Sequence, residues 1–458
     1  MAIATVNPAT GETVREFEPH DAAAVERRIA EADAAARALR AFSYAHRRNW
    51  MHAAADLLEA DVDSRARILT LEMGKPLAQA RAEVLKSARG MRYYADHAAQ
   101  YLADEPLADA SVVGASEAYT RYEPLGVVLA VMPWNYPFWQ VIRFAAPALM
   151  AGNAGLLKHA SNVPQSALYL DELFDKAGFP TGSFRTLLIG SREVESVIAD
   201  PRVRAVTLTG SEPAGRAVAA TAGREIKKTI LELGGSDPFI VMPSADLEAA
   251  ASTAVMARTM NNGQSCIAGK RFLVHADVYD AFADLFVEKM ETLKMGDPFD
   301  EDVEIGPLAT ESGRNELAEL VDDAVACGAR VLTGGRTPEL PGWFYPPTVI
   351  DQLPMNARLV MEEAFGPVAS LYRVANRDEA VQIANQTAFG LSSAVWTDDP
   401  EEQQWFIQSL DAGSVFVNGM TVSHPELPFG GVKASGFGRE LAASGIREFT
   451  NLKTVWRA

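Results

Sequence analysis

The segment Asn261–Ile267 places a cysteine thiol in a short polar loop. Cys266 follows asparagine, glycine, glutamine and serine residues, whereas a structural cysteine usually lies in an apolar run. An ordinary thiol has a pKa of about 8.5, so a nucleophilic cysteine needs help to ionise at neutral pH. Lys270 and Arg271 follow closely, and two nearby cations would favour the thiolate. The loop alone fits a catalytic nucleophile and fits equally a cysteine without a role.

Three further polar residues fall where predicted strands end. Glu232 offers a carboxylate after the apolar run Thr229–Leu231, Asn135 offers an amide donor, and Lys158 offers a cation. A thiol, a base and an amide donor suit acyl chemistry at a carbonyl: the sulfur attacks carbon, the donor stabilises the oxyanion, and the base assists thioester hydrolysis. Simpler roles stay open, since Asn135 could cap a helix, Glu232 could pair with a cation, and Lys158 could be a solvated strand end.

The elements that must position these residues alternate between strands and helices from Leu125 onward. Strands are expected at Gly126–Met132, Gly155–Lys158, Thr186–Ile189, Ala205–Thr209 and Lys228–Leu233. Helices are expected at Phe144–Met150, Pro164–Ala177, Val194–Ile198 and Glu212–Ala222. Such alternation predicts a parallel doubly wound sheet. Ligands of these sheets bind at the carboxyl ends of the strands, where the polar residues above are found.

The remaining segments predict a second α/β domain and two peripheral pieces. Residues 235–430 repeat the alternation, with strands expected at Pro238–Val241, Phe272–Val274, Ala329–Leu332, Ser370–Val374, Ser393–Val395 and Ser414–Val417. Residues 21–104 predict alanine-rich helices broken at Gly74–Pro76. Residues 106–124 predict an exposed hairpin, and the tail Arg447–Trp456 predicts a strand that pairs with the hairpin of a neighbouring subunit.

Composition limits the classes of function. A chain of 458 residues is expected to form two or three domains. Its net charge of −18 argues against non-specific nucleic-acid binding and against anionic membranes. The apolar stretch Leu125–Leu157 is interrupted by three prolines and Arg143, which predicts a buried core rather than a membrane span. The N-terminus has no export signal, and two cysteines, Cys266 and Cys327, fit a reducing cytoplasm.

Six ordered motifs make the sequence resemble the aldehyde dehydrogenase superfamily over essentially its whole length. They are Pro133–Pro137, Leu208–Ser211, Leu231–Gly235, Gly263–Cys266, Glu362–Pro367 and Pro428–Gly431. The resemblance implies that Cys266 is the nucleophile, that Glu232 is the general base, and that Asn135 and the Cys266 backbone N–H form the oxyanion hole. No metal site is predicted.

The same resemblance implies an α/β, aldehyde dehydrogenase-like fold in three parts. Residues 1–105 and 125–233 would form a Rossmann-type cofactor-binding domain, and residues 234–430 an α/β catalytic domain. Residues 106–124 and 440–458 would form a small oligomerisation β-sheet, which implies a homodimer or homotetramer.

The resemblance also implies a nicotinamide cofactor. The residues that would bind it are Trp134, Asn135, Lys158, His159, Ser161, Gly210, Ser211, Leu233, Glu363 and Phe365. NAD-preferring members of the family carry a glutamate three residues after the strand-end lysine, where it bonds the ribose 2′-OH. This chain has Ser161 there, and Lys158, His159 and Ser161 could all favour a 2′-phosphate. NADP is therefore expected, with NAD as a weaker alternative.

Within the family, the chain resembles bacterial NADP-dependent succinate-semialdehyde dehydrogenases. That likeness places Arg143 and Ser423 at the distal carboxylate of the substrate, because a guanidinium binds a carboxylate in bidentate fashion. Met260 departs from the pattern, since some members have a second arginine there; Arg258 lies nearby and is left unassigned. The alternatives are a dehydrogenase for another aldehyde and a cysteine hydrolase or acyltransferase without a cofactor.

Overall fold

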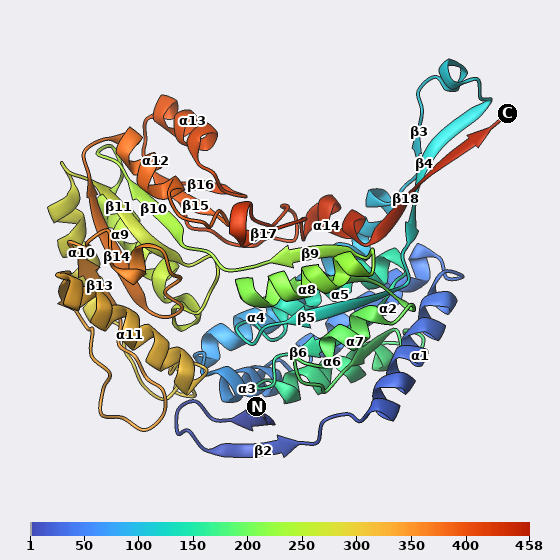
Figure 1. The fold of residues 1–458 in the computed structure, drawn as a ribbon, viewed down its shortest axis with the longest axis horizontal. Helices are drawn as coiled ribbons and strands as arrows, with labels where there is room; N and C mark the ends of the chain where they lie inside the picture. The colour runs from blue at the N-terminus through green and yellow to red at the C-terminus, as the bar shows by residue number, and fades with distance from the viewer. Residues whose placement is uncertain (1) are drawn as a thin grey trace.

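A computed structural model describes residues 2–458, which form two lobes and a projecting arm (Figure 1). The first lobe contains a six-stranded sheet in the order β17-β9-β8-β5-β6-β7. Its strands are β5 (Val127–Met132), β6 (Ala154–His159), β7 (Phe184–Thr186), β8 (Val203–Thr209), β9 (Lys228–Glu232) and β17 (Gly436–Phe437). All pairs are parallel except β17 with β9. Apolar runs such as that of β5 form these strands because both faces of a parallel sheet are buried.

Helices cover both faces of this sheet. Those between its strands are α5 (Trp139–Ala151), α6 (Pro164–Lys176), α7 (Val194–Ala199) and α8 (Glu212–Arg224). The N-terminal segment adds α1 (Ala22–Leu39), α2 (Tyr44–Glu59), α3 (Val62–Met73) and α4 (Leu77–Tyr101). Gly74, in the left-handed conformation, ends α3, so the predicted break is confirmed. The hairpin of β1 (Ile3–Val6) and β2 (Thr13–Phe17) was not predicted.

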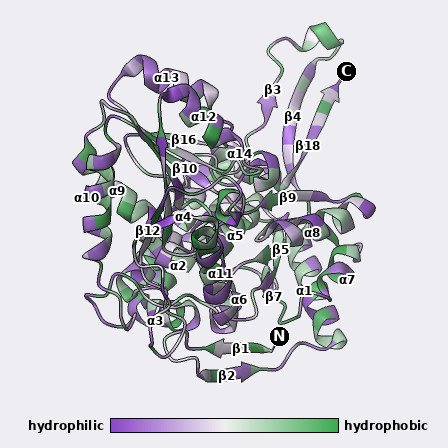
Figure 2. Ribbon diagram, turned by 60° about the vertical axis from the view of Figure 1, so that its left-hand side comes forward, coloured by the Kyte–Doolittle hydropathy of each residue, from purple (hydrophilic) through white to green (hydrophobic). Residues whose placement is uncertain are grey.

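The second lobe contains a seven-stranded sheet in the order β12-β13-β14-β11-β10-β15-β16. Its strands are β10 (Asp237–Val241), β11 (Gly269–His275), β12 (Arg330–Thr333), β13 (Thr348–Asp351), β14 (Val368–Val374), β15 (Ser393–Trp396) and β16 (Val415–Val417). Its helices are α9 (Leu247–Thr259), α10 (Tyr279–Glu291), α11 (Glu311–Cys327), α12 (Arg377–Asn385) and α13 (Pro400–Ser409). Surface helices such as α10 carry both hydrophobic and hydrophilic residues (Figure 2), as expected for elements that cover a core.

The arm consists of β3 (Glu105–Pro106), β4 (Glu117–Pro124) and β18 (Thr450–Arg457). β18 pairs with β4 of the same chain along its full length, from Thr450 opposite Pro124 to Arg457 opposite Glu117. The expectation that the tail pairs with the hairpin of a neighbouring subunit is therefore wrong. A turn before β18 brings it back beside β4, so the partner strand is already present within one chain.

Only the end of the segment 440–458 belongs to the arm. α14 (Ala442–Glu448) precedes β18 and packs against α4 and α5 of the first lobe. Short 3-10 turns complete the described chain at Ala110–Val113, Met260–Gly263, Arg358–Val360 and Lys433–Ser435. Within residues 2–458, none of the helices combines the length and the apolar character needed to cross a membrane.

Candidate active site

Cys266 lies in the loop between α9 and β11, and this loop is pinned by the Asn262 side chain. The Asn262 amide donates to the carbonyls of Gly74 and Pro307, each at 2.9 Å, and its oxygen accepts from the Gly306 N–H at 2.8 Å. Asn262 has a φ of 57°, in the left-handed region that asparagine tolerates better than most residues. Two separate segments, around Gly74 and at Gly306–Pro307, are thus tied to the loop that carries the thiol.

The amide of Asn135 lies against the same loop. Its Nδ2 donates to the Gln264 carbonyl at 3.1 Å, and the Asn261 amide donates to the carbonyls of Asn135 and Gln264 at 2.8 and 3.0 Å. Asn135 is buried and follows β5, whose carboxyl end faces the loop. The end of β5 therefore holds the Asn135 amide against the carbonyl of Gln264, which lies two residues before Cys266 in the chain.

Burial dominates the ionisation of the Cys266 thiol. It raises the pKa of Cys266 to about 12, against the opposing effect of the Arg143 and Lys270 charges. The Lys270 ammonium group donates to the carbonyls of Ser265 and Cys266 at 3.0 and 2.8 Å and forms a 3.0 Å ion pair with Glu363. The resting thiol is therefore neutral at physiological pH.

Arg271 does not assist the thiol as its position in the sequence suggested. Its guanidinium donates to the carbonyls of Ser236, Ile383 and Ala384 and is buried in the second lobe. Successive residues of a strand point to opposite faces of the sheet, so Lys270 and Arg271 cannot both face the loop. Of the two expected cations, only Lys270 contacts the Cys266 backbone.

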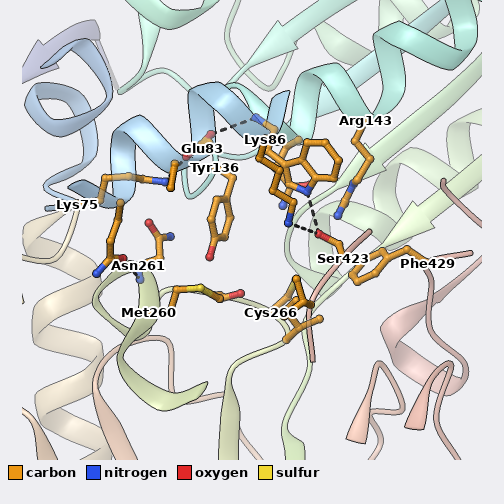
Figure 3. Close-up of a pocket in the computed structure, with 17 residues that line it drawn as sticks. Lys75, Glu83, Lys86, Tyr136, Arg143, Met260, Asn261, Cys266, Ser423 and Phe429 are labelled. Atoms are coloured by element: carbon orange, nitrogen blue, oxygen red, sulfur yellow. Dashed lines mark hydrogen bonds and ion pairs between the residues drawn. The ribbon is translucent and has the colours of Figure 1, made fainter. Parts of the chain in front are cut away.

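A cavity of about 170 Å³ opens beside Cys266. Its walls come from the end of α3 and from α4, from α5, from the nucleophile loop, and from the loop before β17. Figure 3 shows Cys266 at one side of this cavity, with Arg143, Lys86 and Ser423 gathered near Phe429. The cavity therefore joins a thiol to basic and hydroxyl groups that are remote in sequence.

Glu232 ends β9 and is buried beside a second acid, Glu440. Burial and the Glu440 charge raise the pKa of Glu232 well above its usual range, which favours the neutral form of its carboxyl group. Neither of its oxygens has a hydrogen-bond partner within residues 2–458. The predicted base is not among the residues that line the cavity.

Arg143 lines the cavity, but its charge is already paired. Its Nε forms an ion pair with Glu440, its Nη2 donates to the Thr209 hydroxyl at 3.4 Å, and its guanidinium lies 4.7 Å from the centre of the Phe429 ring. Both members of the ion pair are buried. Arg143 lies at the cavity as predicted, with the Glu440 carboxylate as its partner, and its contact with a substrate carboxylate stays a prediction. Glu440 lies in none of the sequence motifs, so the sequence did not predict this ion pair.

Ser423 lines the cavity as expected, and Lys86 was missed. The Ser423 hydroxyl oxygen accepts hydrogen bonds from Lys86 Nζ and from Trp139 Nε1, both at 2.9 Å. Lys86 lies on α4 within an alanine-rich helix, where a lysine usually marks a solvated face. Only the fold shows that this turn of the helix faces the cavity.

Arg258 does not take the place of the arginine that is absent at Met260. Its side chain is fully buried beneath the nucleophile loop, where it donates to the Gly263 carbonyl. Met260 itself lines the cavity and Arg258 does not. Arg258 therefore supports the loop and leaves the cavity wall apolar at this point.

A second, larger cleft of about 750 Å³ lies on the other side of the loop and collects several predicted cofactor residues. Trp134, Glu363 and Phe365 line it, and the Trp134 and Phe365 rings meet edge to face at 5.7 Å. Glu363 Oε1 is ion-paired with Lys270 at 3.0 Å. A β-carbon on Gly234 would overlap with Glu363 Oε2, so glycine at this position leaves room for the carboxylate. A carboxylate beside two aromatic rings fits the ribose and nicotinamide end of a dinucleotide.

The other cofactor residues lie at strand ends of the first sheet. Lys158 is the penultimate residue of β6 and Ser161 lies two residues after the end of the strand; both are partly exposed, and burial lowers the pKa of Lys158. Ser211 is the N-cap of α8, but its side chain makes no capping bond, and Gly210 precedes it. The N-terminus of a helix favours an anion. Leu233 packs against Gly215 beneath this turn. These groups fit the phosphates of a dinucleotide.

His159 does not belong with them. It is buried, and its Nε2 donates to the Pro137 carbonyl at 2.9 Å, while its Nδ1 accepts from the Ala160 N–H at 3.0 Å. Burial lowers the pKa of His159 to about 4. The neutral ring has a single N–H, and the Pro137 carbonyl uses it, so the expected donation to a phosphate is wrong.

Comparison with known proteins places this geometry in context. The model of the aldehyde dehydrogenase family matches residues 1–455. A succinate-semialdehyde dehydrogenase [NADP(+)] 1 from Mycobacterium ulcerans is 63% identical over 457 residues and covers 100% of both chains. One of the same name from Mycobacterium tuberculosis is 63% identical over 458 residues, again with 100% of both chains. The crystal structure of succinic semialdehyde dehydrogenase from Streptococcus pyogenes in complex with NADP+ is 36% identical, with a TM-score of 0.96 and 99% of both chains covered. These similarities confirm the predicted α/β fold.

Proposed function

The chain belongs to the aldehyde dehydrogenase family, and from this premise we propose that it oxidises succinic semialdehyde to succinate with NADP. One observation carries the proposal: a small cavity joins the Cys266 thiol to basic side chains from two helices. A short aldehyde with a distal carboxylate matches both ends of such a cavity. The full-length identity to relatives named for this reaction supports it.

The first step uses the nucleophile loop. Cys266 gives its proton to water and its sulfur attacks the aldehyde carbon, so that the carbonyl π electrons move to oxygen and the alkoxide of a thiohemiacetal forms. The alkoxide that develops accepts hydrogen bonds from the Asn135 amide and the Cys266 N–H. A donor of this kind contributes about 10²–10³ in rate. Because the Asn135 amide is already held at the loop, it needs no reorganisation when the charge appears.

NADP, when bound, supplies a hydride acceptor. Ser161 and Lys158 would bind its 2′-phosphate, Ser211 and the first turn of α8 would bind its pyrophosphate, and Glu363 would bind its nicotinamide ribose. Trp134 and Phe365, which line the second cleft, would lie beside the nicotinamide end.

Glu232 then activates water for hydrolysis of the thioester. In the structure its carboxyl group points toward Gly430, since a β-carbon there would lie 2.7 Å from Glu232 Oε1. It must therefore turn toward the thioester before it can act as a base. Burial and the Glu440 charge raise the pKa of Glu232, and the Arg143 charge opposes them.

We further propose that the protein forms homo-oligomers in the cytoplasm. The arm projects from the first lobe (Figure 1) and exposes Leu452 and Trp456 on β18, with Val112 in the turn before β4. Large exposed apolar side chains on a projecting sheet are typical of an assembly surface. The free thiols of Cys266 and Cys327 need a reducing compartment.

The test is steady-state oxidation of succinic semialdehyde and butanal, each with NADP and NAD, followed by the absorbance of reduced nicotinamide. We expect kcat/KM to be about 100-fold higher for the acidic aldehyde and higher for NADP than for NAD. Cys266→Ala should remove turnover while NADP still binds, and Ser161→Glu should shift preference toward NAD through repulsion of the 2′-phosphate.

Two results would contradict the proposal. Equal efficiency with both aldehydes would indicate a dehydrogenase for another substrate. Acyl transfer or hydrolysis without nicotinamide would favour the cofactor-independent alternative.

A further inference from the structure

Lys86 projects from α4 into the cavity that contains Cys266 (Figure 3). Its side chain is half-buried, lies 4.7 Å from the centre of the Trp139 ring, and donates one hydrogen bond, to Ser423 Oγ. An ammonium group has three N–H donors. Lys86 therefore retains donors that no side chain of its surroundings satisfies.

The charges around the cavity single out this residue. Three cations line it: Lys75 is ion-paired with Glu83, Arg143 is ion-paired with Glu440, and Lys86 has no carboxylate partner in the part of the chain that the structure describes. Burial and the Arg143 charge lower the pKa of Lys86 to about 8, as expected for an ammonium group without a counter-ion. A buried unpaired charge is costly, so this arrangement is explained if a ligand supplies the anion.

The Ser423 hydroxyl group also has a donor available to a ligand in the cavity. Its oxygen already accepts two hydrogen bonds, from Lys86 and from Trp139. A serine hydroxyl has two acceptor positions and one donor. Both acceptor positions are filled, and the O–H remains available to donate. Lys86 and Ser423 thus offer only donors to the cavity, which is the pattern that a carboxylate recognises.

We propose that Lys86, together with the Ser423 O–H, binds the distal carboxylate of the aldehyde and sets the preference for an acidic substrate. This inference rests on the proposed function and deepens it. Lys86 takes the role expected of Arg143. The Arg143–Glu440 ion pair then forms a wall without net charge, and the Lys86 ammonium group gains its only carboxylate partner when substrate binds.

The test compares Lys86→Met with the native protein, using succinic semialdehyde and the uncharged butanal. Methionine keeps the apolar length of the side chain and removes the charge. We expect KM for succinic semialdehyde to rise about 30- to 100-fold, because a charge-assisted hydrogen bond is lost. We expect kcat for both aldehydes, and KM for butanal, to change less than about threefold. Lys86→Arg should recover part of the loss.

Arg89→Met is the matched control. Arg89 lies on the same helix, one turn away, but it is exposed and ion-paired with Glu426, and it does not line the cavity. This variant should leave both KM values unchanged. Should Lys86→Met fail to fold, Ser423→Ala gives the same comparison, with a smaller selective rise for the acidic aldehyde.

The outcomes distinguish failure of the proposed function from failure of the role assigned to Lys86. If the native protein does not prefer the acidic aldehyde, the proposed function fails. If the native protein prefers it and Lys86→Met loses both aldehydes equally, or neither, the assignment of Lys86 is overturned. Succinate inhibition gives a second readout: it should be competitive with the aldehyde in the native protein and weakened in Lys86→Met. Unchanged inhibition would also overturn the assignment.

Discussion

Cys266 and Glu232 both lie in surroundings that favour their neutral forms. Burial raises the pKa of each group, and the Glu440 charge adds to the effect at Glu232. Cys266 must release its proton before the sulfur attacks, so this step should accelerate as the pH rises.

Alkylation of Cys266 by iodoacetamide should show this directly. Because the pKa of Cys266 is raised to about 12, the thiolate is a minor species and its fraction should grow about tenfold per pH unit between about pH 7 and pH 9. The measurement is intact mass against time, in a Cys327→Ser background so that only one thiol reacts. The urea-unfolded protein is the control, and its rate should begin to level near pH 8.5, as for an ordinary thiol. A plateau of the native rate near pH 8 would contradict the expectation.

The buried Arg143–Glu440 ion pair should contribute to the stability of the folded protein. Arg143→Met leaves the buried Glu440 carboxylate without its partner, and we expect the free energy of unfolding to fall by about 3–5 kcal/mol. The double variant Arg143→Met/Glu440→Gln removes both charges and should lose less than the single variant. Urea unfolding at one protein concentration measures both. Losses that simply add would show that the pair is not coupled.

At the scale of elements, the loop between α9 and β11 is held by contacts from outside it. Asn261 and Asn262 both adopt left-handed backbone conformations, and Gly263 continues the positive φ values. This tight bend presents the carbonyl of Gln264 to the Asn135 amide. The side chain of Asn262 then fixes the bend to segments around Gly74 and Pro307.

Substitution at Asn262 can separate its two contributions. Asn262→Gly keeps the left-handed backbone but loses three hydrogen bonds, whereas Asn262→Ala loses the hydrogen bonds and strains the backbone as well. We expect the alanine variant to be less stable than the glycine variant by about 1 kcal/mol. Both should lose kcat, because Cys266 and Asn135 are no longer held together. Thermal unfolding measures the stabilities, and steady-state kinetics measure kcat. If the alanine and glycine variants were equally stable, backbone strain at Asn262 would not contribute to the loss.

The elements differ in how far the sequence reveals them. The strand expected at Gly126–Met132 corresponds to β5 (Val127–Met132), because a fully buried parallel strand leaves an uninterrupted apolar run. β13 (Thr348–Asp351) was missed because its four residues follow two prolines and carry too little pattern. The partner of β18 could not be read from the tail, because strand pairing depends on where the chain turns and not on the strand itself.

The residues of the site also divide into those that the sequence reveals and those that only the fold reveals. Contiguous sequence motifs contain Cys266, Asn135 and Glu232, and such motifs can be recognised from the sequence without the fold. Lys86 and Glu440 stand in no motif, and their importance arises from neighbours hundreds of residues away. His159 had the right position along the chain, but its ring turned into the core to satisfy the Pro137 carbonyl, a choice that only packing decides.

At the scale of the whole molecule, the projecting arm is the surface on which we propose that the chain assembles. Leu452 is 58% exposed on β18, and β18 lies at an edge of its sheet. An apolar edge strand that projects into solvent invites pairing or packing.

Leu452→Glu should therefore weaken assembly without unfolding the chain. A charge in an apolar interface is desolvated without a partner, and we expect the dissociation constant of the oligomer to rise by about 10-fold or more. Light scattering after size-exclusion chromatography measures the mass. Val14→Glu is the control, since Val14 is similarly exposed, at 53%, but lies on β2 away from the arm. An unchanged mass for Leu452→Glu would place the interface elsewhere.

The chain returns to the first lobe through β17 and α14, and this return affects when the first lobe can fold during translation. β17 completes the edge of the first sheet beside β9, and α14 packs on α4 and α5. These pieces lie at Gly436–Phe437 and Ala442–Glu448, so a ribosome must synthesise the whole second lobe before the first lobe can close. Until β17 and α14 emerge, the edge of β9 and the surface of α4 that they cover stay open. Such a nascent chain is prone to aggregation, and we expect it to depend on chaperones that hold a long, half-finished chain.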